Sequence, residues 1–402
     1  MLKVSNFSKG HSINSDKYRE NLKKTKSIFN SFLDDLKNFK IPLLNSYEKD
    51  YKLDFSKSMI KKFSNYKNII IIGMGGSILG TKSIYSFLNK KIKKKVFFFD
   101  NLDLNLNLNY NKIKNLKSSC FIVAGKSGRT IETIINLGSI FSKKLFKNKL
   151  IIIAQKTDNA LINIASKYQA EVIEHKEFIS GRYSVLSETG MFPAALMGLN
   201  LSNFKNLKGL IKNKTFVSNL IQNVAYIYTF NNKKIYNSII LNYDSDLNDL
   251  GYWYQQLVAE SLGKKGKGIN PTLSFAPKDH HSLLQLYLDG PKDKFFTFFQ
   301  SSKKKDKFKI SQEIIPNNMK FLKNKKLSYI INAQFNAVKN IFSSKKIPYR
   351  QVIFSKKNEK ELGQAFTFFA LETILLARLM NLNPFDQPAV EEVKIETKKI
   401  LI

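Results

Sequence analysis

Residues 68–80 read NIIIIGMGGSILG, a run of four isoleucines followed by a glycine-rich turn and then by helix-compatible sequence. Short β-branched runs of this kind are typical of strands that are buried on both faces of a sheet. A strand that leads directly into a glycine turn and a helix is the repeating unit of parallel α/β folds. The stretch therefore predicts a strand of a parallel sheet, with a candidate ligand-binding turn at its carboxyl end.

Further short apolar runs follow along the chain and alternate with segments of helical spacing. In the first half, the expected strands lie at 95–100 (KVFFFD), 120–124 (CFIVA), 150–154 (LIIIA) and 171–174 (EVIE), and helical patterns lie at 131–145 and 160–168. In the second half, the expected strands lie at 235–241, 295–299, 329–333 and 351–354. The alternation predicts two doubly wound parallel-sheet units, over about 46–190 and about 200–375.

Helical segments flank the two α/β units. Apolar residues recur at helical spacing up to about residue 65, which predicts a helical N-terminal lead-in. At the other end, residues 359–402 predict a long apolar helix through Met380, a turn at NPFDQP and a closing amphipathic helix.

The composition is that of an ordinary globular protein. The chain has 402 residues, of which 43% are hydrophobic, and a single cysteine, so no intramolecular disulfide can form. The first residues contain no apolar segment typical of a signal peptide, and no run approaches the length of a membrane span. We therefore expect a protein of a reducing compartment, the cytoplasm, with no membrane partner.

The net charge of +35 favours anionic partners, but its make-up argues against nucleic acid. Only five of the 66 basic residues are arginine, whereas proteins that read bases depend on the bidentate arginine fork. The lysines are spread along the chain, with clusters at 91–95 and 303–305. We interpret the charge as a general lysine bias, expect no specific nucleic acid partner, and expect small anionic substrates to be attracted.

A candidate base lies within residues 255–289. Gln256 and Glu260 are four residues apart and share one face of an expected helix, with Leu257 and Leu262 as apolar neighbours. Apolar neighbours disfavour a charged carboxylate, which would suit Glu260 to take and give a proton. The alternative is an exposed or salt-bridged helix glutamate.

Two adjacent histidines, His280 and His281, open the following apolar run. Histidine is the side chain whose ordinary pKa lies nearest neutrality, so a pair close to a candidate base suggests acid–base chemistry. A metal site would need further ligands, and the lone Cys120 lies far away in an apolar run. We therefore expect no metal.

The glycine-rich turn GMGGSILG, at 73–80, resembles a dinucleotide-binding fingerprint. Asp100 ends the next expected strand, where a ribose-binding acid would lie. The third glycine of the fingerprint would, however, fall at Ile78. A dinucleotide site is therefore an alternative to a simple anion-binding turn at this position.

A second turn, GKSGRTIET at 125–133, combines Lys126, Ser127, Arg129 and Thr130 with two glycines. Hydroxyls, backbone amides and cations on one turn at the start of a helix suit a phosphate monoester. The chain has no GxxxxGK[ST] motif, so a nucleoside triphosphate is not expected.

A third turn, SGRYSVLSETG, places Arg182 directly after Gly181 in a chain that uses few arginines. A guanidinium can neutralise an enolate-like oxygen without giving up its own proton. The alternative is an arginine that ties down the junction between the two units.

Near the C-terminus, the stretch PFDQPAVEEVK places Gln387 at a turn and Lys394 on the following helix. Taken alone, this stretch would pass as a surface helix. Its interest lies in its combination with the other motifs.

In this order, the stretches resemble the glucose-6-phosphate isomerase (phosphoglucose isomerase) family. ESLGK, HHSLLQLYLDGPKDK and FDQPAVEEVK are specific to that family, whereas the first two glycine turns occur in phosphosugar-binding (SIS) domains generally. The resemblance implies two doubly wound SIS-type domains at 46–195 and 196–380, a helical segment at 1–45, and a helical tail at 381–402 that contributes to the active site. It also implies no cofactor and a homodimer in which His281 reaches the partner subunit's site.

The resemblance further implies the reversible interconversion of glucose 6-phosphate and fructose 6-phosphate by ring opening and a cis-enediol. Glu260 would move a proton between C2 and C1, and Arg182 would steady the enediol. His281 would open the ring, helped by Lys394. The residues implied to bind substrate are Gly76, Ser77, Lys126, Ser127, Thr130, Gly181, Gln256 and Gln387.

Three positions depart from the family's pattern. Gly125 stands where a serine is usual, Arg129 where a threonine is usual, and His280 where a glutamine commonly precedes the histidine. The lost hydroxyl removes a phosphate donor and Arg129 adds a cation, so the phosphate contacts and the sugar preference are open. The alternatives are a related phosphosugar isomerase, such as one that accepts mannose 6-phosphate, and a non-catalytic phosphosugar-binding regulator.

Overall fold

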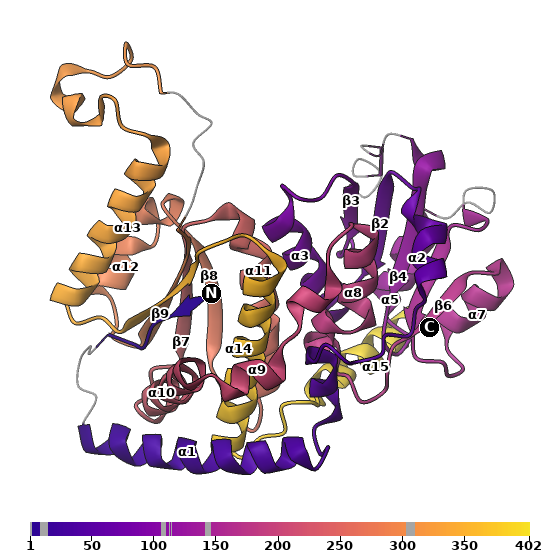
Figure 1. Cartoon of the computed structure of the whole chain (residues 1–402), viewed down its shortest axis with the longest axis horizontal. Coiled ribbons are helices and arrows are strands. Elements are labelled where there is room, and N and C mark those ends of the chain that lie inside the picture. The colour runs from indigo at the N-terminus through magenta and orange to yellow at the C-terminus, as the bar shows by residue number, and fades with distance from the viewer. Residues whose placement is uncertain are drawn as a thin grey trace.

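The computed structural model describes residues 2–8, 15–105, 110–111, 113, 115–140, 146–302 and 310–402. These residues form two five-stranded sheets that lie side by side (Figure 1). Both faces of each sheet are covered. For example, Ile69 and Ile71 pack into one core cluster, whereas their neighbours Ile70 and Ile72 pack into another on the opposite face. The predicted doubly wound α/β fold is therefore confirmed.

In the first sheet, every neighbouring pair of strands is parallel. Its strands, in spatial order, are β3 (Lys95–Phe99), β2 (Asn68–Gly73), β4 (Ser119–Ala124), β5 (Leu150–Ala154) and β6 (Glu171–Glu174). All five lie where the sequence predicts them. The helices of this half are α2 (Lys57–Ser64), α3 (Leu79–Leu88), α5 (Ile131–Ser139), α7 (Ala160–Tyr168) and α8 (Glu188–Leu196). Residues 141–145 of the helix predicted at 131–145 lie outside the described residues.

The second sheet has four parallel strands and one antiparallel edge strand. Its strands, in spatial order, are β1 (Lys3–Val4), β10 (Tyr349–Phe354), β9 (Lys294–Ser301), β7 (Asn237–Asn242) and β8 (Asn270–Phe275). The helices of this half and of the tail are α1 (Ser15–Lys37), α9 (Leu207–Lys212), α10 (Lys214–Asn232), α11 (Asn248–Leu262), α12 (Leu284–Asp289), α13 (Leu327–Ser344), α14 (Glu359–Leu379) and α15 (Ala389–Leu401).

The strands of the second sheet are predicted less completely. The predictions for β7, β9 and β10 are confirmed, but the strand predicted at 329–333 is wrong, because this segment lies inside α13. A short apolar run without a bounding turn fits a helix as well as a strand. Neither β1 nor β8 is predicted. Strand β8 carries Pro271, which a strand at the edge of a sheet tolerates.

Helix α14 is the central helix of the second half, as the sequence predicts. Within the described ranges it is the one helix that is long and apolar enough to cross a membrane by length and composition. In the fold, 89% of that apolar stretch is buried, and the helix packs against α1, α10 and α11. It therefore occupies the position of a core helix. The lysine cluster at 303–305, by contrast, lies outside the described residues.

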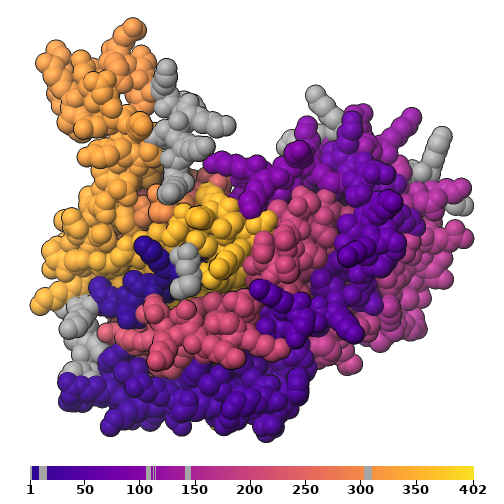
Figure 2. Space-filling model, in the orientation of Figure 1, coloured from indigo at the N-terminus to yellow at the C-terminus, as the bar shows by residue number. Residues whose placement is uncertain are grey.

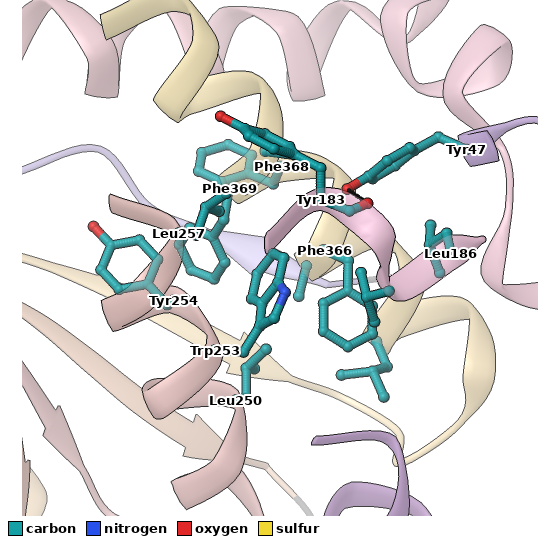
Figure 3. Packing of buried hydrophobic residues seen from close by; sticks show 14 of the residues in the cluster. Tyr47, Tyr183, Leu186, Leu250, Trp253, Tyr254, Leu257, Phe366, Phe368 and Phe369 are labelled. Carbon is teal, nitrogen blue, oxygen red and sulfur yellow. Dashed lines mark hydrogen bonds between the residues drawn. The ribbon is translucent and has the colours of Figure 1, made fainter. Parts of the chain in front are cut away.

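An aromatic core joins the two halves of the molecule. Trp253 of α11 packs against Phe366 of α14 with ring centroids 4.8 Å apart, and Tyr254 packs against Phe369 at 4.7 Å. Figure 3 shows Tyr183, from the 3₁₀ turn η4 (Gly181–Leu186) of the first half, in the same core. This core fixes α11 against η4. Because it is continuous, the division at residues 195 and 196 stays a prediction.

A buried ion pair links the second sheet to α14. Arg350 of β10 and Glu372 of α14 are both almost fully buried. The guanidinium forms two hydrogen bonds with the carboxylate, and the Nη2–Oε1 bond is 2.9 Å long. Arg350 Nε also donates to Thr297 Oγ1 of β9 at 3.0 Å. Two strands and the central helix therefore depend on one charge pair.

Replacement of Glu372 by glutamine should lower the free energy of unfolding by about 3 kcal/mol, because it leaves the charge of Arg350 buried without its partner. Urea-induced unfolding followed by circular dichroism measures this loss. As a matched control, Glu20→Gln breaks an exposed pair with Lys17 and Lys24 on α1, and the unfolding midpoint should hardly change. Equal midpoints for Glu372→Gln and the unaltered chain would contradict the role given to the pair.

Candidate active site

Helix α11 carries the candidate base on the predicted face. Gln256 Nε2 donates a hydrogen bond to Glu260 Oε1 at 2.9 Å, as expected for residues four apart on a helix. Leu257 and Leu262 are fully buried and hold the opposite side of the helix in the core. The carboxylate itself does not lie among apolar groups. It faces an amide and a guanidinium, and its side chain is 34% exposed.

Arg182 meets Glu260 directly. Its side chain is almost fully buried, at 1% exposed, and its Nη1 lies 3.1 Å from Glu260 Oε2. The same nitrogen donates to Gln387 Oε1 at 2.8 Å. With Gln256, the structure therefore brings four predicted site residues into one hydrogen-bonded group, although Glu260 and Gln387 lie 78 and 205 positions from Arg182 in the sequence.

The remaining donors of Arg182 tie down the tail. Nε donates to Ser261 Oγ at 2.8 Å, and Nη2 donates to the carbonyl oxygens of Pro384 and Asp386 at 2.5 and 2.9 Å. Ser261 Oγ is in turn 3.1 Å from the hydroxyl of Tyr183. The alternative role considered for Arg182, that of a junction arginine, is thus also fulfilled. The same bonds fix its direction toward Glu260.

The first glycine turn packs against the Arg182 turn. A Cβ atom on Gly76 would lie 2.2 Å from the carbonyl carbon of Gly181, so only glycine allows this approach. Gly75 has a φ of +51°, and a Cβ there would lie 2.8 Å from Gln256 Nε2. Both glycines are thus required by the packing of this turn against Gly181 and Gln256. Asp100, the candidate ribose-binding acid, instead forms a 2.6 Å ion pair with Lys82 of α3. Ser77 lies largely buried at the end of this turn.

The second glycine turn connects β4 to the N-terminus of α5. Lys126 Nζ donates to the carbonyl oxygen of Glu177 at 2.8 Å, and partial burial lowers the pKa of this lysine. Ser127 and Arg129 are exposed. Thr130 is the N-cap residue of α5, but its side chain does not cap the helix in the described structure. The turn therefore carries several groups that can donate hydrogen bonds to one anion. Among the described residues, no hydrogen bond connects this turn with Glu260.

A cleft of about 510 Å³ opens beside Glu260, between the end of α11 and the tail. Its wall includes Gln387 and Val390. Lys264 also lines the cleft, with its Nζ 2.6 Å from Asp386 Oδ1 and also bonded to the carbonyl oxygen of Asn383. The bond from Lys264 lowers the pKa of Asp386. In the described part of the chain, no group of three or more His, Cys, Asp or Glu residues could hold a metal ion.

Two predicted site residues lie apart from this group. His281 is exposed on the 3₁₀ turn η7 (Lys278–His281), whereas His280 Nε2 lies 2.8 Å from the hydroxyl of Tyr243. Lys394 is exposed on α15 and bonds to Glu391 Oε1 at 2.5 Å. Within the described ranges, neither His281 nor Lys394 forms a hydrogen bond with the Glu260 group.

Sequence reasoning assigns no role to Ser261 and Lys264, although both lie inside the stretch that carries Glu260. Ser261 follows the base and therefore points to another face of α11, where nothing in the sequence indicates that Arg182 will lie. Lys264 is one lysine among many in this chain, so nothing in the sequence indicates that it, rather than another lysine, pairs with Asp386.

Comparison with solved structures supports the fold. A hypothetical protein from Thermus thermophilus has a TM-score of 0.80 and 19% identity, with 100% of both chains covered. A glucose-6-phosphate isomerase from Chlamydia trachomatis has a TM-score of 0.71 and 17% identity, with 86% of this chain and 71% of that chain covered.

Comparison of sequences gives the family. The chain is 33% identical over 361 residues to a glucose-6-phosphate isomerase of Methanocaldococcus jannaschii, which covers 86% of this chain and 87% of that protein. It is 31% identical over 376 residues to a glucose-6-phosphate isomerase of Campylobacter jejuni, with 87% and 89% covered. The family model described as phosphoglucose isomerase matches residues 54–401. This chain therefore belongs to the phosphoglucose isomerase family.

Proposed function

We propose that this chain interconverts glucose 6-phosphate and fructose 6-phosphate, with Glu260 as the base and Arg182 as the group that stabilises the intermediate. The observation that carries the proposal is the 3.1 Å contact between the two side chains at the wall of an open cleft. The relatives from M. jannaschii and C. jejuni bear the name of this activity. The reaction is an intramolecular oxidoreduction, in which an aldose becomes a ketose.

The reaction moves one hydrogen between adjacent carbons. Glu260 takes the proton from C2 of the open-chain aldose, the electron pair left behind forms the C1–C2 double bond, and the oxygen on C1 takes up a proton. Glu260 then returns its proton to C1, where the electron pair of the double bond forms the new C–H bond. The hydroxyl on C2 loses its proton and becomes the ketone, and this proton, released to water, balances the one that the C1 oxygen took up from water. One carboxylate suffices because C1 and C2 are neighbours and the same oxygen reaches both.

Arg182 offsets the negative charge that develops on the sugar oxygens. Its guanidinium is held by hydrogen bonds to the tail and α11, so it does not have to reorient during the reaction. Gln256 and Gln387 bond to the two members of the pair, and Gln387 lines the cleft. We assign both glutamines and Gly181 to the binding of the sugar chain. The absence of a side chain on Gly76 lets the first turn close against this group.

We assign the phosphate to the turn between β4 and α5, with Ser77 from the neighbouring turn. Lys126, Ser127 and Thr130 supply a cation and two hydroxyls at the N-terminus of α5, where backbone N–H groups favour an anion. Gly125 supplies no hydroxyl. The exposed guanidinium of Arg129 adds a charge that compensates for this loss.

We further propose a homodimer in which His281 opens the sugar ring in the partner subunit's site. The exposure of His281, and its separation from the Glu260 group of its own chain, support this assignment. Lys394 assists from the tail. It lies one helical turn after Val390, which lines the cleft, so the two share a face of α15.

Exposed apolar side chains support the association of two copies. Residues 310–326 project from the second half of the molecule as an arm (Figures 1 and 2). On this arm, Ile314 and Phe321 are 79% and 69% exposed. Such side chains mark contact surfaces when they gather on one element. We place the dimer in the cytoplasm, the reducing compartment that suits a chain whose only cysteine is a buried thiol.

Glu260→Gln should reduce turnover at least about a thousandfold, because an amide cannot accept the C2 proton. The affinity for fructose 6-phosphate should stay within about tenfold, since the shape and the hydrogen bonds of the site are kept. A coupled assay of glucose 6-phosphate formation measures turnover, and exchange of the C2 proton with heavy water measures proton abstraction. Titration calorimetry with fructose 6-phosphate measures the affinity. As a control, Glu171→Gln changes a carboxylate of β6 that pairs with Lys62 and should leave turnover unchanged. Near-normal turnover of Glu260→Gln would refute the mechanism.

Ser261→Ala should lower kcat about tenfold with little change in KM, because Arg182 loses the acceptor of its Nε and its direction toward Glu260 becomes less fixed. The control is Ser187→Ala, which removes a buried serine hydroxyl of the first half that bonds to Ser184 rather than to Arg182. Steady-state kinetics and thermal unfolding of both variants separate an effect on catalysis from a general loss of stability. An equal fall in kcat for both variants would show that any buried hydroxyl matters, and not the position of Arg182.

Mixed dimers test the assignment of His281. Glu260→Gln and His281→Ala chains should each be inactive alone. Refolded together, they should recover roughly a quarter of normal activity, because half of random dimers are mixed and each mixed dimer has one intact site. If His281 acted within its own chain, every site in the mixture would carry a defect and no activity would return. The turnover of the refolded mixture therefore decides between the two arrangements.

A further inference from the structure

A second large cleft lies at the carboxyl edge of the second sheet. It has a volume of about 760 Å³ and shares no lining residue with the cleft beside Glu260. The end of β9 and the first turns of α13 form its walls. Its polar lining includes Gln300, Ser301, Ser302, Lys326 and Asn332.

The cleft occupies the position at which open parallel sheets bind ligands. Among the four parallel strands of the second sheet, β7 comes first in the chain, and its two neighbours β8 and β9 lie on opposite sides of it. The strand order therefore reverses between β7 and β9, and a crevice forms outside their carboxyl ends. The first sheet has the same arrangement at β2 and β4, where we place the phosphate of the sugar substrate. Tyr243, directly after β7, and Ser302, directly after β9, both line the second cleft.

The lining is suited to an anion. Lys326 is the N-cap residue of α13, an 18-residue helix whose N-terminus carries no side-chain cap among the described residues. The helix dipole and the lysine thus place positive charge at the same wall. No carboxylate belongs to the described lining.

Ser301 provides an independent indication of a ligand. This serine lines the cleft, is only 6% exposed, and its Oγ has no hydrogen-bond partner among the described residues. A buried hydroxyl without a partner costs free energy unless a further group satisfies it. Next to Ser301 in the chain, Gln300 Nε2 donates to Asn332 Oδ1 at 3.1 Å, so that β9 and α13 each contribute an amide to the lining of the cleft.

We propose that this cleft is a second binding site for a small phosphate monoester. The phosphate lies between Lys326, the N-terminus of α13 and the hydroxyls of Ser301 and Ser302. The amides of Gln300 and Asn332 and the ring of Tyr329 face the polyol part of the ligand. This site is separate from the isomerase site, and its occupation does not require Glu260.

Equilibrium dialysis with radiolabelled inorganic phosphate tests the proposal on the full-length protein. The unaltered chain should bind two phosphates, one at each sheet. Lys326→Glu should bind one and keep its isomerase turnover, and Ser127→Asp should bind one because it blocks the turn after β4. Lys345→Glu is the matched control, since it makes the same change of charge at the other end of α13 and should still bind two.

Ser301→Val, combined with Ser127→Asp, tests the buried hydroxyl. The remaining phosphate should bind at least about tenfold more weakly than to Ser127→Asp alone, because one hydrogen bond to a charged group is lost. Two outcomes would overturn the proposal: a single phosphate per unaltered chain that Ser127→Asp abolishes, or two phosphates retained by Lys326→Glu. If Lys345→Glu weakened phosphate binding as much as Lys326→Glu, the binding would come from the overall positive charge and not from this cleft, and the proposal would also fail.

Discussion

The guanidinium of Arg182 is the group on which the site depends. It is almost fully buried, and a buried charge is tolerated only when its donors are satisfied. Its partners come from two parts of the chain far from its own turn: Glu260 and Ser261 from α11, and Gln387 with two carbonyl oxygens from the tail. Meeting this requirement therefore assembles the site. The cation cannot be stable unless α11 and the tail are both in place.

This constraint also explains why the site lies between the two sheets. The Arg182 turn belongs to the first half, whereas α11 belongs to the second, and the aromatic core around Trp253 holds them together. The close approach of Gly76 to Gly181 admits no side chain, so the glycine turn after β2 is part of the same closure. Lys264, whose side chain is largely buried, also holds the tail through its ion pair with Asp386. Each of these contacts supports the direction in which Arg182 faces Glu260.

The sequence predicts what depends on local periodicity and misses what depends on distant contacts. The buried strands β2, β4 and β5 are short continuous apolar runs and are found correctly. The segment 329–333 is misassigned as a strand because a short apolar run alone fits a strand as well as a helix. The residues that follow it, Phe335, Val338 and Phe342, are spaced by three and four, which is helical, and are buried in α13. The pairing of Gln256 with Glu260 follows from their spacing. The bonds of Arg182 to Ser261 and to the tail join segments that no periodicity relates.

The proposed site residues fall into two groups that lie apart within one chain: Glu260 with Arg182, and His281. One chain by itself brings together Glu260 and Arg182, the groups that we propose for the proton transfer. The proposed ring-opening group, His281, is exposed on a turn outside the Glu260 group of the same chain. A lone chain would therefore handle the open-chain sugar but would lack the step that supplies it from the ring. Activity on the cyclic sugar would then follow the fraction of chains in the dimer, which rises with protein concentration by mass action. In this proposed arrangement, the association of two copies would itself be part of the catalytic apparatus, because the partner's histidine would supply the open-chain sugar on which Glu260 and Arg182 act.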